Sequence, residues 1–326
     1  MLLLQPQFAI FAHKPDRMHP DTLALRPQTT PKPSVTMNIR TVLAALAAFG
    51  FTLSCPAAEP TPHSLWAQPQ PPFRIFGNTY YVGTKGISVV LIASDAGHVL
   101  IDGGLPESAH SVAQNVRALG FKIEDVKVIL NSHAHSDHAG AIAALQKSSK
   151  ATVFSSPEGV AALAQGHGST NDPQFEFGDS FPPVANAKTV DDGEAVRVGS
   201  LGVTVHYTPG HTPGGTSLSW KSCENDRCLN LVYADSLNAV SDNSFKYSGD
   251  PRYPNALEDF RRTLRKLESL PCDILISAHP EFSELWERLD ARHAGEQDAM
   301  IDPSMCRRYV AAARSRLEKR IASERN

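Results

Sequence analysis

Four side chains that can bind a metal ion lie within a run of six residues. They are His133, His135, Asp137 and His138, in the segment NSHAHSDH at 131–138. Imidazole and carboxylate groups together suit a divalent transition metal such as zinc. In an extended or turning segment, residues two positions apart point to the same side, so the first two histidines face one ion while the other two ligands turn towards a second. The segment therefore predicts a site for two metal ions.

Two further histidines lie in matching contexts, each just after a strand-like run and beside a proline. They are His211 in TPGHTPGG (208–215) and His279 in SAHP (277–280). Loops at strand ends are where a rigid scaffold presents ligands. The two predicted ligand sets are His133, His135 and His211 for one ion, and Asp137, His138 and His279 for the other. Three protein ligands and one open position are typical of a catalytic zinc site, and two zinc ions roughly 3.5–4 Å apart can activate a shared water for attack on a carbonyl.

The apolar pattern indicates which elements position these ligands. Residues 126–130 form a short apolar run suited to a buried strand that leads directly into the ligand segment. Before it, runs separated by glycine turn signals predict an antiparallel meander. The meander is expected at 74–82, 87–93 and 98–101, later strands at 152–155, 195–198, 203–207, 217–220, 229–233 and 274–277, and helices at 108–119, 139–146, 157–165, 256–270 and 305–320. This order favours two sheets packed face to face with helices outside.

Two segments have no regular period. Residues 59–72 are rich in proline and are expected to form an extended arm, and residues 166–183 form a long irregular loop. Loops of that length inside a compact domain are usually functional.

The composition is that of a globular protein. The chain has 326 residues, 31 basic against 34 acidic side chains, and 41% hydrophobic residues. A net charge of -3 without a long Lys/Arg run disfavours nucleic acid as a partner. We also expect no membrane span, because the main apolar run is 14 residues long, whereas a helix needs about 20 to cross a bilayer.

The N-terminal part is expected to lie outside the folded domain. Residues 1–36 contain six prolines and no period, which predicts a disordered or untranslated leader. From Met37, one positive charge, an uncharged run and the sequence CPAA have the layout of a secretory signal peptide at 37–58. The mature chain would be a single domain at 59–326 in the periplasm or outside the cell. Lipidation of Cys55 is the alternative for this segment.

Four cysteines remain in that mature chain. An even number in an exported protein predicts disulfides. Cys223 and Cys228 flank a polar turn between two strand-like runs, so we expect them to pair across a hairpin, which leaves Cys272 to pair with Cys306. A zinc site built from the four is the alternative, but the spacing lacks the two close pairs of a zinc ribbon or finger.

The chain resembles the metallo-β-lactamase superfamily, whose signature His-x-His-x-Asp-His stands here at 133–138. The resemblance covers about 65–310 and implies an α+β four-layer αβ/βα sandwich, with two mixed sheets face to face and helices outside. The other matching segments, in family order, are VLIDGG at 99–104, TPGHTPGG at 208–215, YADS at 233–236 and AHP at 278–280.

Within that superfamily the chain is similar to the subclass B3 β-lactamases. They keep three histidines at the first metal and lack a cysteine ligand at the position where this chain has Asp235-Ser236. The resemblance implies a monomeric, zinc-dependent class B β-lactamase with two Zn²⁺ ions. Its substrates would be penicillins, cephalosporins and carbapenems, so it would confer antibiotic resistance.

The resemblance also implies roles for particular residues. A zinc-bound hydroxide would attack the lactam carbonyl, and Asp137 would bind the second ion and orient that hydroxide. Asp102 would support a ligating histidine, since such histidines usually need an acceptor on their other nitrogen. Ser236 and Asn238 would hydrogen-bond the substrate carboxylate, and the loop 166–183 would overhang the site.

The main alternative is another hydrolase of the same fold, such as an acyl-homoserine lactonase or a glyoxalase II-like thioesterase. In those enzymes a carboxylate near the Asp235 position bridges the two metals. The Ser-Leu-Asn that follows Asp235 and the predicted signal peptide argue against them. A non-catalytic metal-binding protein would lack one of the ligands, whereas all six are present here.

Overall fold

The computed structural model describes residues 62–325. The predicted leader at 1–36 and signal peptide at 37–58 lie outside the described residues and stay predictions. Within 62–325, no helix combines the length and the apolar character needed to cross a lipid bilayer.

The first half of the described chain forms a mixed sheet of seven strands in the order β1 to β7. The first four strands pair antiparallel, as the predicted meander requires, and β4 to β7 pair parallel. The strands are β1 Phe73–Phe76, β2 Thr79–Tyr81, β3 Val90–Ile92, β4 His98–Ile101, β5 Val126–Leu130, β6 Thr152–Ser155 and β7 Lys188–Thr189.

The second half forms a mixed sheet of five strands in the order β12-β11-β10-β9-β8. Only β11 and β12 pair parallel in this sheet, and the other neighbours are antiparallel. The strands are β8 Ala195–Val198, β9 Leu201–Tyr207, β10 Thr216–Glu224, β11 Arg227–Ala234 and β12 Ile274–Ser277.

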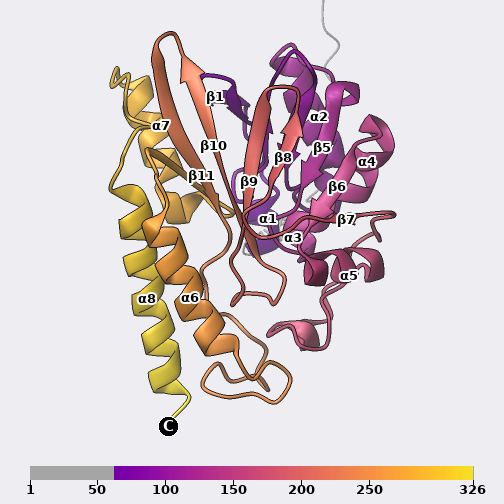
Figure 1. Cartoon of the computed structure of the whole chain (residues 1–326), viewed down its shortest axis with the longest axis vertical. Coiled ribbons are helices and arrows are strands. Elements are labelled where there is room, and N and C mark those ends of the chain that lie inside the picture. The colour runs from indigo at the N-terminus through magenta and orange to yellow at the C-terminus, as the bar shows by residue number, and fades with distance from the viewer. Residues whose placement is uncertain (1–61, 326) are drawn as a thin grey trace, which may run out of the picture. The chain divides into compact units, whose positions relative to one another are not determined.

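The two sheets pack face to face between two layers of helices (Figure 1). The helices α2 (Ala109–Ala118), α4 (Ile142–Ser149) and α5 (Pro157–Gln165) cover the outer face of the seven-stranded sheet. The helices α6 (Ala256–Ser269) and α8 (Met305–Ser323) cover the outer face of the five-stranded sheet. This arrangement confirms the predicted four-layer sandwich with helices outside.

Alternation along the strands builds this layering. In β5, Val128 and Leu130 pack between the sheets, whereas Ile129 packs against the helices. Successive side chains of a strand point to opposite faces, so a strand with helices on one face and a sheet on the other is apolar on both. Burying each such side chain stabilises the fold by about 1.5–3 kcal/mol.

Three helical segments differ from the expectation. The arm predicted to be extended contains a short helix, α1 (Pro62–Trp66), and its proline stands at the first helical turn, where the missing N–H costs little. The helix predicted at 139–146 is instead two helices, α3 (Ser136–Ala139) and α4. A further helix, α7 (Leu285–His293), had no prediction.

The break between α3 and α4 has a cause in the hydrogen bonding. The carbonyl of His138 accepts from the backbone N–H of Gly103 at 2.8 Å, and the N–H of Ala141 donates to the carbonyl of Gly104 at 3.2 Å. In a continuous helix these groups would bond to residues four positions away. The break joins the ligand segment to the loop after β4.

Both disulfides have the predicted pairing. Cys223–Cys228 closes the hairpin between β10 and β11, where the two cysteines are direct cross-strand partners. Cys272–Cys306 joins the segment before β12 to the first turn of α8.

Candidate metal centre

The candidate ligands lie at strand ends that meet at one edge of the sandwich. Because β4 and β5 are parallel, Asp102 and the segment 131–138 leave the first sheet at the same edge. In the second sheet β9, β11 and β12 run in one direction, so the loops that carry His211, Asp235 and His279 also leave together. Parallel strands thus bring ligands distant in sequence to one place.

Asp102 fastens the ligand segment to both sheets. This fully buried residue has a left-handed backbone (φ 60°), a conformation that aspartate tolerates better than most residues. Its carboxylate accepts hydrogen bonds from the Ser132 amide at 2.7 Å, the Ser132 hydroxyl at 2.6 Å and the Tyr233 hydroxyl at 2.7 Å. One of its oxygens also lies 3.5 Å from Nδ1 of His138. The predicted support of a histidine by Asp102 therefore has a counterpart in the geometry.

Three of the predicted histidines form one group. The ring centroids of His133, His135 and His211 lie 4.8 to 5.1 Å apart. One nitrogen from each ring converges within 4.8 Å of the others, so the group could hold a metal ion. The first predicted ligand set is thus brought together.

Each of these rings has its other nitrogen engaged by an oxygen. Nδ1 of His133 lies 2.7 Å from Oδ1 of Asp235, and Nδ1–H of His211 donates to the carbonyl of Asn238 at 2.7 Å. For His135 the engaged atom is Nε2, which lies 3.1 Å from Oδ2 of Asp172. Histidines that bind metals generally carry such a partner on the second nitrogen, because it fixes the tautomer and the ring orientation.

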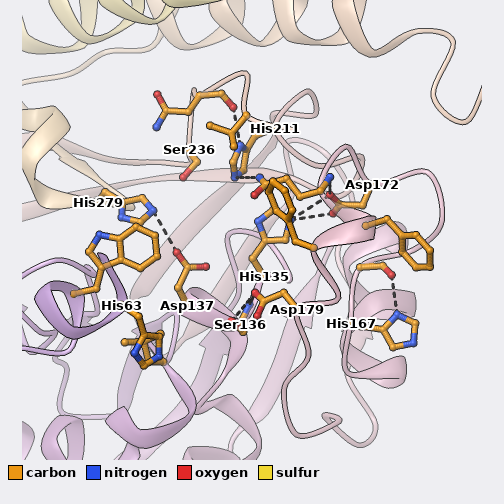
Figure 2. Close-up of a pocket in the computed structure, with 18 of the residues that line it drawn as sticks. His63, His135, Ser136, Asp137, His167, Asp172, Asp179, His211, Ser236 and His279 are labelled. Atoms are coloured by element: carbon orange, nitrogen blue, oxygen red, sulfur yellow. Dashed lines mark hydrogen bonds and ion pairs between the residues drawn. The ribbon is translucent and has the colours of Figure 1, made fainter. Parts of the chain in front are cut away.

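The second predicted set is also brought together. Oδ2 of Asp137 lies 3.2 Å from Nε2 of His138 and 3.4 Å from Nε2 of His279, and the two nitrogens are 3.3 Å apart. Figure 2 shows Asp137 pointing towards His279. Zinc–ligand bonds of about 2.0–2.1 Å in tetrahedral geometry place neighbouring ligand atoms about 3.3–3.4 Å apart. The three atoms therefore have the spacing of one face of a zinc coordination shell.

The electrostatics of this second group favour a cation. Burial would raise the pKa of Asp137, but the His138 and His279 side chains outweigh it and hold that pKa well below the usual carboxyl range. Burial would lower the pKa of His138, but Asp137 and Asp102 raise it to about 10. A positive charge beside these carboxylates is thus favoured even at a fully buried side chain.

Four of the six candidate ligands, two from each group, line a cavity of about 980 Å³ (Figure 2); they are His135, His211, Asp137 and His279. The predicted substrate-binding residues Ser236 and Asn238 also line it, and the buried hydroxyl of Ser236 has no hydrogen-bond partner among the described residues. On the rim, the Trp66 ring of α1 packs on His279 with centroids 5.1 Å apart. The loop 166–183 forms one side of the cavity, as expected.

The sequence analysis missed several of these residues. Asp172 and Gln174, from the loop 166–183, lie next to His135 and His211 respectively. The length of that loop indicated a function, but no spacing linked Asp172 to a histidine 37 positions earlier. Trp66 lies in a segment that had been expected to be an extended arm.

The position of Asp235 bears on the alternative hydrolases. Its fully buried carboxylate lies against Nδ1 of His133, and it belongs to neither converging group. Gly215 packs directly behind it, since a Cβ there would lie 2.4 Å from Oδ2 of Asp235. This carboxylate contacts a candidate ligand histidine and is not among the atoms that converge in either group.

Solved structures similar to this chain are metallo-β-lactamases. The Rm3 metallo-β-lactamase is 55% identical with a TM-score of 0.80, and the match covers 81% of this chain and 98% of that one. MEM-A1, a subclass B3 metallo-β-lactamase from a soil metagenome library, is 53% identical with a TM-score of 0.77, covering 79% of this chain and 98% of that one.

Curated relatives match a shorter stretch. The hydroxyacylglutathione hydrolase of Anaeromyxobacter dehalogenans is 29% identical over 161 residues, which are 49% of this chain and 50% of that protein. The chain thus spans about half the length of the curated relatives that it matches. The family model described as the metallo-beta-lactamase superfamily matches residues 82–224. With the identity and coverage of the solved structures, this match shows that the chain belongs to the metallo-β-lactamase superfamily.

Proposed function

We propose that the protein is a zinc-dependent β-lactamase of subclass B3 that hydrolyses the amide of the β-lactam ring. The observation that carries the proposal is the pair of adjacent three-atom groups, each of which contributes two residues to the lining of one cavity. The similarity to MEM-A1, which is itself described as subclass B3, supports the subclass.

The donor set fits two zinc ions. His133, His135 and His211 would hold one ion, and Asp137, His138 and His279 the other. All six are imidazoles or a carboxylate, which are the ligands zinc prefers in catalytic sites, and the second group has tetrahedral spacing. When bound, zinc would lower the pKa of a water and polarise a carbonyl oxygen.

The chain's own residues would orient the substrate and the water. Asp137 would accept a hydrogen bond from the attacking water through its carboxylate. The hydroxyl of Ser236 has no other partner among the described residues, so it is free to donate to the substrate carboxylate, with the Asn238 amide beside it. The loop 166–183 and Trp66 would limit the access of bulk water to the reacting amide.

The wider substrate range and location are also part of this proposal. We infer activity on penicillins, cephalosporins and carbapenems, as a monomer that acts after export to the periplasm. Support for export is the signal-peptide pattern at 37–58. N-terminal sequencing of the exported protein tests it, and a mature chain that still begins at Met1 would contradict it.

A thioesterase or lactonase is the competing activity, and the similarity to a hydroxyacylglutathione hydrolase favours it. The contact of Asp235 with Nδ1 of His133 argues against it, since this contact already engages one carboxylate oxygen with a candidate ligand histidine.

Hydrolysis of a carbapenem and a cephalosporin by the purified protein tests the proposal. Loss of lactam absorbance should occur in zinc buffer and stop after a chelator is added. A folded, zinc-replete sample that leaves both antibiotics intact but cleaves an acyl thioester or an acyl lactone would replace this proposal with the competing activity.

A further inference from the structure

We propose that Asp172 is a positioning residue for the first metal, and that the loop 166–183 is therefore part of the metal site as well as its cover. The inference rests on the proposed function, because it assumes that His133, His135 and His211 bind an ion. It assigns a role to a residue outside the six ligands.

The carboxylate of Asp172 lies directly behind His135. Its two oxygens are 3.1 and 3.3 Å from Nε2 of His135, and the residue is only 4% exposed (Figure 2). With Nε2 engaged in this way, Nδ1 of His135 is left for a metal. Both carboxylate oxygens approach the same nitrogen, so they fix the tautomer and restrict rotation of the ring.

The loop is built to hold this carboxylate in place. The Asp172 amide donates to the carbonyl of Ser169 at 2.8 Å, and Oδ1 of Asp172 accepts from the amide of Gln174 at 2.8 Å. Gly168 lies so close that a Cβ there would be 2.9 Å from Oδ2 of Asp172. The close approach and the local turn indicate that the side chain has one well-defined position.

A second anchor fixes the same loop from the other side. The carbonyl of Pro173 accepts from the amide of Asp242, and Oδ2 of Asp242 accepts from the amide of Glu176. The loop is thus held between His135 and the segment that follows β11. Removal of Asp172 would release the loop from the histidine while leaving this second anchor intact.

The other two histidines of the first group have partners of a different origin. Asp235 and the carbonyl of Asn238 follow directly from β11, a central strand of its sheet. The partner of His135 instead comes from the loop 166–183, which precedes β8. We therefore expect changes in this loop to alter metal binding at the first site in addition to substrate binding.

The test is metal affinity, measured by titrating the metal-free protein with zinc against a competing chelator. In a His279→Ala background the second site is disabled, so the titration reports the first site. Asp172→Ala is expected to weaken first-site binding about 10- to 100-fold, the usual effect of losing such a partner. Asp172→Asn keeps an acceptor oxygen without the charge, so its first-site zinc affinity should lie between that of the protein with Asp172 intact and that of Asp172→Ala.

Glu176→Gln is the matched control. Glu176 lies in the same loop, but its side chain is 59% exposed, faces Arg252 at 3.9 Å and does not line the cavity. This variant should bind the first metal with unchanged affinity. The absorption spectrum of the cobalt-substituted protein gives a second readout, since a misplaced His135 changes the coordination geometry.

The outcomes separate this inference from the proposed function. A parent protein that binds no zinc would remove the proposed function. The role of Asp172 alone would be overturned if the parent protein binds two ions and Asp172→Ala changes neither the first-site affinity nor the cobalt spectrum. If Asp172→Ala does not fold, Asp172→Asn decides, and affinity equal to that of the parent overturns the inference.

Discussion

The ends of the strands and the loop 166–183 contribute to the same cavity in different ways. The segments that follow the strands supply all six candidate ligands, two of them, Asp137 and His138, from the short helix α3. In the second group the donor atoms lie 3.2 to 3.4 Å from one another. The loop supplies no candidate ligand, but it holds His135 through Asp172 and forms a side of the cavity. Short segments anchored at strand ends thus supply the candidate ligands, whereas the longer loop supplies orientation and access.

Removal of a strand-end ligand should have the largest effect. His133→Ala removes one ligand nitrogen from the first group. A bound metal stabilises the transition state by several kcal/mol, so kcat/KM for a β-lactam should fall on the order of a thousandfold. Steady-state kinetics with measured zinc content checks this. The control His110→Ala changes an exposed histidine on α2 and should leave both kcat/KM and the zinc content unchanged. Full activity of His133→Ala would contradict the strand-end assignment.

Removal of the support behind a strand-end ligand should have the next largest effect. Asp235→Ala deprives Nδ1 of His133 of its partner, so first-site zinc affinity should fall about 10- to 100-fold. Asp235→Asn retains an acceptor and should recover part of that loss. If Asp235 instead bridged two metals, Asp235→Asn would lose metal as completely as Asp235→Ala. The zinc content of the two variants therefore distinguishes a supporting carboxylate from a bridging one.

Weakening the second loop anchor should change stability more than chemistry. Asp242 is buried, and its carboxylate accepts from Ser244, Phe245 and Glu176. Asp242→Asn should lower the free energy of unfolding by about 1–3 kcal/mol at pH 7, measured by urea denaturation. If Asp242→Asn keeps the free energy of unfolding of the parent protein, this anchor does not contribute to stability.

The same carboxylate predicts an acid dependence. Burial would raise the pKa of Asp242, but the hydroxyl of Ser244 and nearby amides outweigh it and hold that pKa below its usual value of 3.8. Because the folded-state pKa is the lower one, the stabilisation is present above pH 3.8 and is lost as the pH falls through the folded-state value. The difference between parent and Asp242→Asn should therefore shrink on acidification in the same urea measurement.

The smallest effect is expected at the tip of the loop. Phe177 is 55% exposed and lines the cavity beside Phe175 and Val240, which are also exposed apolar residues. Phe177→Ala removes apolar area that a substrate side chain could cover, so KM should rise by about tenfold or less for antibiotics with aromatic side chains. A large fall in kcat for every substrate would mean that the tip takes part in the chemistry.

The sequence predicted the strand-end half of the site well. Spacing in the segment 131–138 and the Gly-His and Ala-His turns predicted six candidate ligands, and the structure brings these residues together. The patterns are local, and the strands that precede them end at one edge of the sandwich. The short apolar run at 126–130 likewise predicted the buried strand that leads into the ligand segment. These features depend on a few neighbouring residues.

The loop half was harder to predict because it depends on distant contacts. Asp172 acquires its role only when the loop folds back on His135, and Asp-Pro in a loop is by itself only a turn signal. The break between α3 and α4 depends on Gly103 and Gly104, which lie far from it in sequence. Tertiary hydrogen bonds overrode the local helical pattern there.

The central claim is that two adjacent metal sites carry out β-lactam hydrolysis. The most direct measurement is carbapenem hydrolysis by the metal-free protein as zinc is added in known amounts. We predict no turnover without zinc, and activity that rises with added zinc until both sites are filled. Turnover that is unaffected by zinc and chelator, or no turnover in a folded protein with both sites filled, would contradict the claim.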